Sequence, residues 1–413
     1  MPTNRRHFFE LLGASAVLAA AGASPLQAAQ GRGSARDGFA FDEAHVPMNA
    51  ANLCPSPKRV AEAVIRYTTL IDADCSFQNR AQFRALTEAS RSAVASLLGV
   101  SADEIAFVRN TSEANNIVNA GLDLNTGDDV LLWDQNHPSN NVAWDVRAAR
   151  SGFSVIRVAV PERPAKPDDL LAPFRAALTP RTAVLSVTHI SNVSGIRLPI
   201  EELGNMCRER GIHFHVDGAQ TWGATATNLD AVGCDSFSAS AHKWFLGPKE
   251  VGLLYLRESA IERLWPSVIS YGWGSDGVSD LVGARKFESL GQRDDAALAA
   301  LAEAAALHAS LGHDRVEAHI QGLASRLKEG LLERGLSLVT PLSPELSGGV
   351  CIADIGGPAR RPVFEALYRD HGIIGAPTGG LRLCPHIYNN EEHVDRAIAG
   401  AAEAYARLGK GFA

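Results

Sequence analysis

A single lysine, Lys243, lies in the small and apolar stretch 237–248, between His242 and a Gly247-Pro248 turn. An amine held among such residues is partly desolvated, which favours its neutral, nucleophilic form. A neutral amine of this kind can form a Schiff base with an aldehyde. A lysine that follows a strand is also commonly a solvated surface residue, so the chemistry of Lys243 depends on the groups around it.

Further polar residues stand where predicted strands end. The run Asn110-Thr111-Ser112 lies between a strand and a helix, where free N–H groups and hydroxyls suit a phosphate, although the same pattern serves as an ordinary helix cap. The remaining positions of this kind are His137, Asn192, Asp217, Gln220, Ser240 and His242.

Asp217 is informative because it ends the apolar run 213–217 and is followed by Gly218-Ala219. A carboxylate at the end of a buried strand needs a partner, and a protonated pyridine nitrogen would be one. His137 could stack on a ring or move protons, and Asn192 could donate a hydrogen bond to a phenolate oxygen. Taken singly, His137 and Asn192 are equally compatible with structural roles.

The segments that carry these residues alternate between short apolar strands and longer helices. The predicted strands are 105–108, 129–133, 155–160, 182–188, 213–217, 236–240 and 252–256, and the helices are 60–70, 83–98, 111–121, 140–151, 167–178 and 199–211. This pattern indicates an α/β fold with a mainly parallel sheet that helices cover on both faces. Such sheets bind ligands at the carboxyl ends of their strands.

The C-terminal part has a different pattern. It predicts helices over 294–311, 320–335, 362–372 and 391–408 and strands over 350–355 and 381–383, which together indicate a smaller α+β domain. The domains expected are thus a leader over 1–29, a linker and N-terminal segment over 30–59, a large domain over 60–293 and a small domain over 294–413.

Composition narrows the class of protein. The 413 residues carry a net charge of −7, and 46% are hydrophobic, which suits a globular protein with a large core and argues against nucleic acid as a partner. The 6 cysteines form no CxxC pair and no Cys/His cluster with zinc spacing, so no metal site is predicted. We expect most of them to be buried, small apolar residues.

The first 29 residues have the features of an export signal. Arg5-Arg6 form a twin-arginine pattern, followed by the apolar run 11–22 and small residues that end near Ala28 or Ala29. An amphipathic first helix or a membrane anchor is the other interpretation, although the run is short for a span of about 20 residues. The signal predicts export by the twin-arginine machinery, a periplasmic or otherwise exported location, and no membrane attachment after cleavage.

Together, the segments 110–114, 188–195, 216–220 and 240–248 resemble the class V aminotransferase family of fold type I pyridoxal 5′-phosphate (PLP) enzymes. The family includes isopenicillin N epimerase-like proteins and cysteine desulfurases. The resemblance runs from about residue 41 to the C-terminus. It implies PLP as cofactor, the fold type I architecture with a mainly parallel sheet of the seven-stranded type, and a homodimer with shared active sites.

The resemblance implies a role for each polar residue. Lys243 matches the Schiff-base lysine, and Asp217 matches the partner of the pyridine nitrogen. Arg382 matches the arginine that binds the substrate α-carboxylate, for which a bidentate pair is the expected chemistry. The other matching positions are His137 stacked on the ring, Asn192 and Gln220 near the ring O3′, and Thr111, Ser112, Ser240 and His242 at the phosphate.

Three departures from the family pattern bear on the reaction. Cysteine desulfurases carry a nucleophilic cysteine on a loop before the arginine, but the corresponding loop 375–380 has none, so persulfide chemistry is not expected. Gln292 replaces a threonine of the epimerase-like branch, which leaves Gln292 and Ser275 as candidates for the phosphate contact across the dimer. Lys249, next to Pro248, stands where small residues are common.

These features predict an exported PLP enzyme that acts at the α-carbon of an amino acid or amine. An aminotransferase-type reaction is the leading prediction, with tailoring of a periplasmic metabolite such as a siderophore as one role. The alternatives are an epimerase like isopenicillin N epimerase and a C–S or other β-lyase. A third alternative, of another class, is a non-catalytic binding protein with the PLP fold.

Overall fold

The computed structural model describes residues 38–270, 272–274 and 276–409. The predicted export signal over 1–29 and Ser275 lie outside these residues. Within them, no helix is long and apolar enough to cross a membrane. Residues Gly38–Ala413 form one compact unit by their contacts, so the predicted division at residue 293 stays a prediction.

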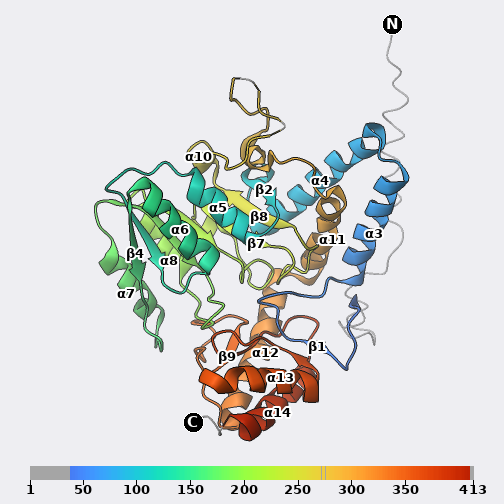
Figure 1. Ribbon diagram of the computed structural model, residues 1–413, viewed down its shortest axis with the longest axis vertical. Helices are drawn as coiled ribbons and strands as arrows, with labels where there is room; N and C mark the ends of the chain where they lie inside the picture. Colours follow the sequence, from blue (N-terminus) through green and yellow to red (C-terminus); the bar gives the residue numbers. More distant parts are fainter. Residues whose placement is uncertain (1–37, 271, 275, 410–413) are drawn as a thin grey trace. The chain divides into compact units, whose positions relative to one another are not determined.

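A seven-stranded sheet forms the centre of the larger part (Figure 1). Its strands, in spatial order, are β2 (Ile105–Val108), β8 (Gly252–Leu256), β7 (Ser236–Ser240), β6 (His213–Asp217), β5 (Thr182–Thr188), β3 (Asp129–Trp133) and β4 (Ser154–Val158). Within this sheet β8 alone runs antiparallel to its neighbours. The predicted α/β fold with a mainly parallel sheet is therefore confirmed.

Successive side chains of a strand point to opposite sides of the sheet, and here the side chains on both sides are buried. Phe107, Leu131 and Leu185 belong to one hydrophobic core. Their neighbours along the same strands, Val108 and Val130, belong to a second core on the other face. The helices of this part are α3 (Lys58–Ala73), α4 (Phe77–Leu98), α5 (Thr111–Gly121), α6 (Pro138–Ser151), α7 (Pro167–Ala177), α8 (Ile200–Arg208), α9 (Leu229–Val232), α10 (Glu258–Ile261) and η3 (Gly283–Glu288).

Helix α11 (Asp295–Leu311) lies alongside α3 and α4 (Figure 1). Its Leu298 and Leu301 are part of the core that contains Phe107. The chain then enters the smaller part, which consists of α12 (His313–Glu333), α13 (Arg360–His371), α14 (Glu391–Leu408), β9 (Cys351–Ala353), β10 (Ile373–Ile374) and β11 (Leu381–Leu383). The core of the sheet therefore extends along α11 as far as Ala305.

The N-terminal segment contributes to the smaller part. Strand β1 (Val46–Pro47) pairs in parallel with β10, and Val46 and Met48 lie in the core formed by α12, α13 and α14. The strands predicted from the sequence do not include this segment. A two-residue strand forms there because its partner, far along the chain, supplies the hydrogen bonds.

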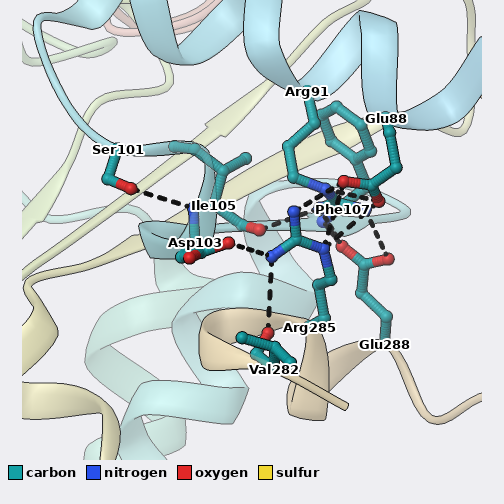
Figure 2. Close-up of polar contacts among 9 residues, drawn as sticks. All are labelled: Glu88, Arg91, Ser101, Asp103, Ile105, Phe107, Val282, Arg285 and Glu288. Atoms are coloured by element: carbon teal, nitrogen blue, oxygen red, sulfur yellow. Dashed lines mark hydrogen bonds and ion pairs between the residues drawn. The ribbon is translucent and has the colours of Figure 1, made fainter.

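The outer edge of β2 is covered by charged side chains from other elements (Figure 2). Arg91 on α4 is buried, and its Nη1 donates to the Ile105 carbonyl at 2.8 Å and to Glu288 Oε1 at 2.5 Å. Glu288 Oε1 also accepts from the backbone N–H of Phe107 at 2.5 Å. These bonds occupy the free backbone groups of an edge strand and hold η3 against the sheet.

Replacing Arg91 with methionine is expected to lower the free energy of unfolding by about 3 kcal/mol, because the buried guanidinium is lost and the partly buried Glu288 would be left without its cation. Denaturant unfolding measures this loss. Arg285→Met is the matched control, since Arg285 pairs with the more exposed Glu88 and Asp103 and should cost distinctly less. Equal losses for the two variants would contradict the importance of the buried pair.

Candidate active site

The predicted polar residues meet at one edge of the sheet. Thr111 follows β2, His137 follows β3, and Asp217 is the last residue of β6. Lys243 lies in the turn after β7, and Asn192 lies in the loop after β5. Because these strands are parallel, their carboxyl ends lie together and form a single site.

Lys243 is held by a tight turn. The Leu246 N–H donates to the Lys243 carbonyl at 3.0 Å, and the Gly247 N–H donates to the Ala241 carbonyl at 2.7 Å. The side chain is half-buried, and burial lowers the pKa of the Lys243 ammonium, with the carboxylate of Asp217 opposing this effect and Arg382 adding to it. The turn therefore favours the neutral amine that a Schiff base requires.

Asp217 is 1% exposed. Its Oδ1 accepts from the Ala219 N–H at 3.0 Å, and its Oδ2 accepts from Asn115 Nδ2 at 2.9 Å. Both donors are neutral, so the buried charge has no cation bonded to it. A protonated ring nitrogen would be a suitable partner.

The start of α5 supplies the features of a phosphate site. Ser240 Oγ accepts from the Thr111 N–H at 2.8 Å and lies 2.7 Å from Thr111 Oγ1. Asn110 caps the helix by accepting from the Glu113 N–H at 3.1 Å. Hydroxyl groups at the positive end of a helix dipole suit an anion.

Gly252 on β8 allows this turn to lie close to the sheet. A Cβ added there would stand 2.7 Å from Cα of Asn110, nearer than packed atoms approach. The glycine is therefore required by the approach of the Asn110 backbone.

His137 caps α6, and its Nδ1 accepts from the Ser139 N–H at 3.2 Å. Nδ1 therefore carries no proton, and the ring proton of the neutral form is on Nε2. Burial lowers the pKa of His137, while the charges of Asp217, Lys243 and Arg382 all act on it. The four residues thus lie within electrostatic range of one another.

His242 is half-buried beside Lys243. Burial lowers the pKa of His242 to about 4, and the charges of Lys243 and Lys249 lower it further. Near neutral pH its imidazole is uncharged, so it can contribute a hydrogen bond to a phosphate but no positive charge.

Arg382 reaches the site from β11 of the smaller part. It is 4% exposed, and its Nη1 and Nη2 donate to the Asn192 carbonyl at 3.0 Å and to Asn49 Oδ1 at 3.1 Å. Its Nε is buried and has no hydrogen-bond partner. A buried guanidinium with neutral partners and an unused donor is suited to binding a carboxylate.

Gln220 is buried next to the site, with both ends of its amide bonded to protein. Its Oε1 accepts from Trp244 Nε1 at 2.7 Å, and its Nε2 donates to the Ala51 carbonyl at 3.1 Å. A ring contact would have to share or replace one of these bonds, so the predicted role of Gln220 at O3′ stays a prediction.

The cysteines do not supply a nucleophile. Five of the six are buried, as expected, and Cys75 is exposed. Cys54 lies beside the site, where its N–H donates to the His242 carbonyl at 2.9 Å, and burial raises the pKa of its thiol to about 12. A thiol that stays protonated is a poor nucleophile.

Sequence reasoning missed three residues of the site, namely Asn115, Asn49 and Cys54. Asn115 lies four residues after Thr111 on α5, and this helical spacing could have placed it on the same face. Asn49 and Cys54 precede the first long helix, and only the fold brings them to Arg382 and His242.

Several histidines around the site are buried and neutral, which predicts a pH dependence of stability. Burial lowers the pKa of His213, His215 and His386 to about 3, below the value of about 6.5 in an unfolded chain. The unfolded state therefore binds more protons between these values. Stability should be retained above about pH 6.5 and fall by up to about 1.4 kcal/mol per pH unit for each group as pH drops toward 3. Melting temperatures from pH 8 to 4 test this, and a flat profile below pH 6 would contradict it.

Comparisons with known proteins show the family to which the chain belongs. The sequence profile described as aminotransferase class-V matches residues 49–373. An isopenicillin N epimerase from Amycolatopsis lactamdurans is 32% identical over 91% of this chain and 98% of the relative. A cysteine desulfurase from Salmonella agona is 28% identical over 75% of this chain and 80% of the relative.

Among solved structures, the apo cysteine desulfurase from Thermococcus onnurineus has a similar fold. It superposes with a TM-score of 0.81 at 25% identity, covering 91% of this chain and 97% of that chain. The chain therefore belongs to the class V aminotransferases, which are PLP-dependent enzymes of fold type I. The expected fold, enzyme class and cofactor are confirmed at this level.

The residues present also fit PLP on the observations above. The half-buried Lys243 suits the PLP aldehyde, and Asp217, which accepts from neutral donors, suits the ring nitrogen. The hydroxyls at the start of α5 suit the phosphate, and the unused Nε of Arg382 suits the carboxylate of an amino-acid substrate. Within the described part of the chain, the hydrogen bonds of Asp217 and Arg382 go to neutral groups.

Proposed function

We propose that this chain is an exported PLP enzyme that acts at the α-carbon of an amino acid or amine, by an aminotransferase-type reaction. The observation that carries the proposal is the meeting of Lys243, Asp217 and Arg382, each on a different element, within electrostatic range of one another. Lys243 would bind the cofactor and move a proton at the substrate α-carbon. Asp217 would hold a proton on the ring nitrogen, and Arg382 would orient the substrate carboxylate.

PLP, when bound, supplies an electron sink for negative charge at the α-carbon. The type of reaction depends on the atom to which the protein returns this proton. A neutral Lys243 amine can act as a base there, because its pKa is lowered toward the working pH. Thr111, Ser112, Ser240 and His242 would bind the phosphate and so fix the ring relative to Lys243.

An epimerase is the second candidate, and the relative named isopenicillin N epimerase favours it. A C–S or other β-lyase is a third, which needs Arg382 but no cysteine. The loop 375–380 lacks a cysteine, and its Gly379, at φ +71°, packs against Val193. A non-catalytic binding protein would not need the lowered pKa of the Lys243 amine.

A panel of amines and of D- and L-amino acids, each followed by cofactor spectrum and product mass, separates these reactions. Transamination converts PLP to its amine form and needs a keto-acid acceptor. Epimerisation exchanges the α-proton with deuterated solvent and interconverts enantiomers. Release of ammonia without an acceptor would reject the aminotransferase proposal in favour of a lyase.

Replacing Arg382 with methionine tests whether the substrate carries a carboxylate. We expect KM for an amino acid to rise by about 30-fold or more, because truncating one side of a buried charge pair costs about 2–5 kcal/mol. An amine without a carboxylate should be affected far less. Equal effects on both substrates would remove Arg382 from carboxylate binding.

A homodimer with shared active sites is also part of the proposal. Large apolar side chains are exposed on and after α3 and in the segment after α10, where a partner could cover them: Ile65, Leu70, Phe77, Trp265, Val268, Ile269, Val278 and Val282. Light scattering after gel filtration tests the assembly, and a monomer of 43.9 kDa would contradict it.

Export by the twin-arginine route is proposed from the leader. Cell fractionation of the full chain, with Arg5→Lys and Arg6→Lys together as the control, tests it. Periplasmic protein from the parent and its loss in the double variant are expected, and the same location for both would contradict the proposal. Tailoring of a periplasmic metabolite such as a siderophore follows only if export is found.

A further inference from the structure

A row of buried hydrogen bonds begins at Asp217 and leads away from the site. Asn115 Nδ2 donates to Asp217 Oδ2 at 2.9 Å, and Asn115 Oδ1 lies 3.0 Å from His215 Nε2. His215 Nδ1 lies 2.8 Å from Ser236 Oγ, which lies 3.0 Å from His213 Nε2. The row therefore connects α5 with two neighbouring strands.

The fold places these residues on one face. His213, His215 and Asp217 alternate along β6, so their side chains point to the same side of the sheet. Ser236 on β7 is in register with His215. All five residues of the row, including Asn115, are at most 2% exposed, so solvent cannot rearrange their hydrogen bonds.

The carboxylate fixes the orientation of the Asn115 amide. With Asp217 ionised, a reversed amide would place its oxygen against Asp217 Oδ2 at hydrogen-bond distance with no proton between them. The Nδ2 donor must therefore face Asp217, and Asn115 Oδ1 must face the other way. That oxygen also accepts from Ser238 Oγ at 2.5 Å.

The same reasoning then fixes every proton along the row. An acceptor at Asn115 Oδ1 requires a proton on His215 Nε2. Neutral His215 then has a bare Nδ1, which must accept from the Ser236 hydroxyl. The Ser236 oxygen in turn accepts from His213 Nε2–H. His213 Nδ1, the last atom, is buried without a partner and needs no proton.

Both imidazoles must be neutral for this arrangement. Burial lowers the pKa of each to about 3, and the charge of Arg263 adds to this at His213. His215 faces Asn115 and Ser236, and its titratable neighbour His213 lowers its pKa further. With Asp217 ionised, the row thus contains as many protons as its hydrogen bonds need.

We propose that Asn115 is a positioning residue for Asp217: when Asp217 is ionised, the row that Asn115 heads permits one proton arrangement, in which Asn115 donates to Asp217 and both histidines carry their proton on Nε2. Its consequence for catalysis rests on the PLP function proposed above, because an anion is what a protonated ring nitrogen needs. The proton arrangement itself does not depend on the cofactor.

Nitrogen NMR of the full chain without cofactor, labelled at histidine, tests the arrangement directly. His213 and His215 are both expected to be neutral with the proton on Nε2 from about pH 5 to 8, since their pKa values are about 3. Single His→Gln variants assign the two signals. A proton on Nδ1 of either ring, or a charged ring in this range, would overturn the proposal.

Asn115→Asp tests the role toward Asp217. Two carboxylates at this distance cannot both stay ionised, so residues 115 and 217 of the variant should share one proton, which weakens the charge that Asp217 offers. We expect PLP to bind about 10- to 100-fold more weakly, as for loss of a hydrogen bond to a charged group, and the His215 signal to change. Binding of PLP as tight as in the parent would overturn the positioning role.

Asn140→Asp is the matched control. Asn140 is also buried on a helix, α6, but its Oδ1 accepts from Trp144 and Ser186 and has no contact with the row. It should lower stability while PLP affinity and both histidine signals stay as in the parent. If the two variants changed all three properties alike, Asn115 would be merely structural. A parent that binds no PLP would refute the proposed function, whereas the NMR result would still decide the row.

Discussion

Lys243→Ala is expected to lose turnover by on the order of 10³-fold or more and to lack the visible absorbance band of bound PLP near about 400 nm. The reason is that Lys243 is the amine that the site holds half-buried, in a turn, with its pKa lowered by burial. Burial also lowers the pKa of Lys286 and Lys328, but the neighbouring charges there are Glu262 for Lys286, and Cys351 and Glu329 for Lys328. Spectra and rates of the purified variant measure both effects.

Lys249→Ala is the control for this experiment. Lys249 lies six residues further along the chain and is exposed, with its Nζ bonded to Ser56 Oγ at 3.0 Å. This variant should keep the band. A band that persists in Lys243→Ala, or one that disappears in Lys249→Ala, would show that the wrong lysine has been assigned.

Asp217→Asn is expected to reduce kcat/KM by on the order of 10²–10³-fold, because a neutral amide cannot stabilise a protonated ring nitrogen. The new NH₂ group would also face either the Ala219 N–H or Asn115 Nδ2, both of which are donors. The variant should still bind PLP, since Lys243 and the start of α5 are unchanged. Activity within a few-fold of the parent would argue against pairing of Asp217 with the ring.

Asp217→Glu separates charge from placement. It keeps the carboxylate but moves it by one methylene. The space beside the next residue, Gly218, is filled by the Phe237 ring, which a Cβ added at 218 would approach to 1.9 Å. We expect Asp217→Glu to retain more activity than Asp217→Asn if charge dominates. The reverse order would mean that the position of the hydrogen bonds matters more than the charge.

Much of the sheet could be predicted because its strands are short, apolar and bounded by turns. The predicted bounds of β2, β5, β6, β7 and β8 agree with the structure. Because the carboxyl ends of parallel strands lie at one edge of the sheet, the positions of Asp217 and Lys243 after their strands were enough to predict that they lie together. The family resemblance supplied the roles.

Other features could not be predicted, because they depend on partners far along the chain. The pairing of β1 with β10 and the bonds from Arg382 to Asn49 and Asn192 join segments that no local pattern connects. The helix predicted over 83–98 begins earlier, at Phe77, because Ser76 caps it by accepting from the Asn79 N–H. The occupied amide of Gln220 is likewise a result of packing against Trp244.

The most direct test of the central claim is reduction of the PLP-loaded protein with borohydride, followed by peptide mass spectrometry. Reduction converts a Schiff base into a stable secondary amine, which marks the lysine that held the cofactor. We expect one modified peptide, with the pyridoxyl group on Lys243. A modification on a different lysine, or none after loading with PLP, would contradict it.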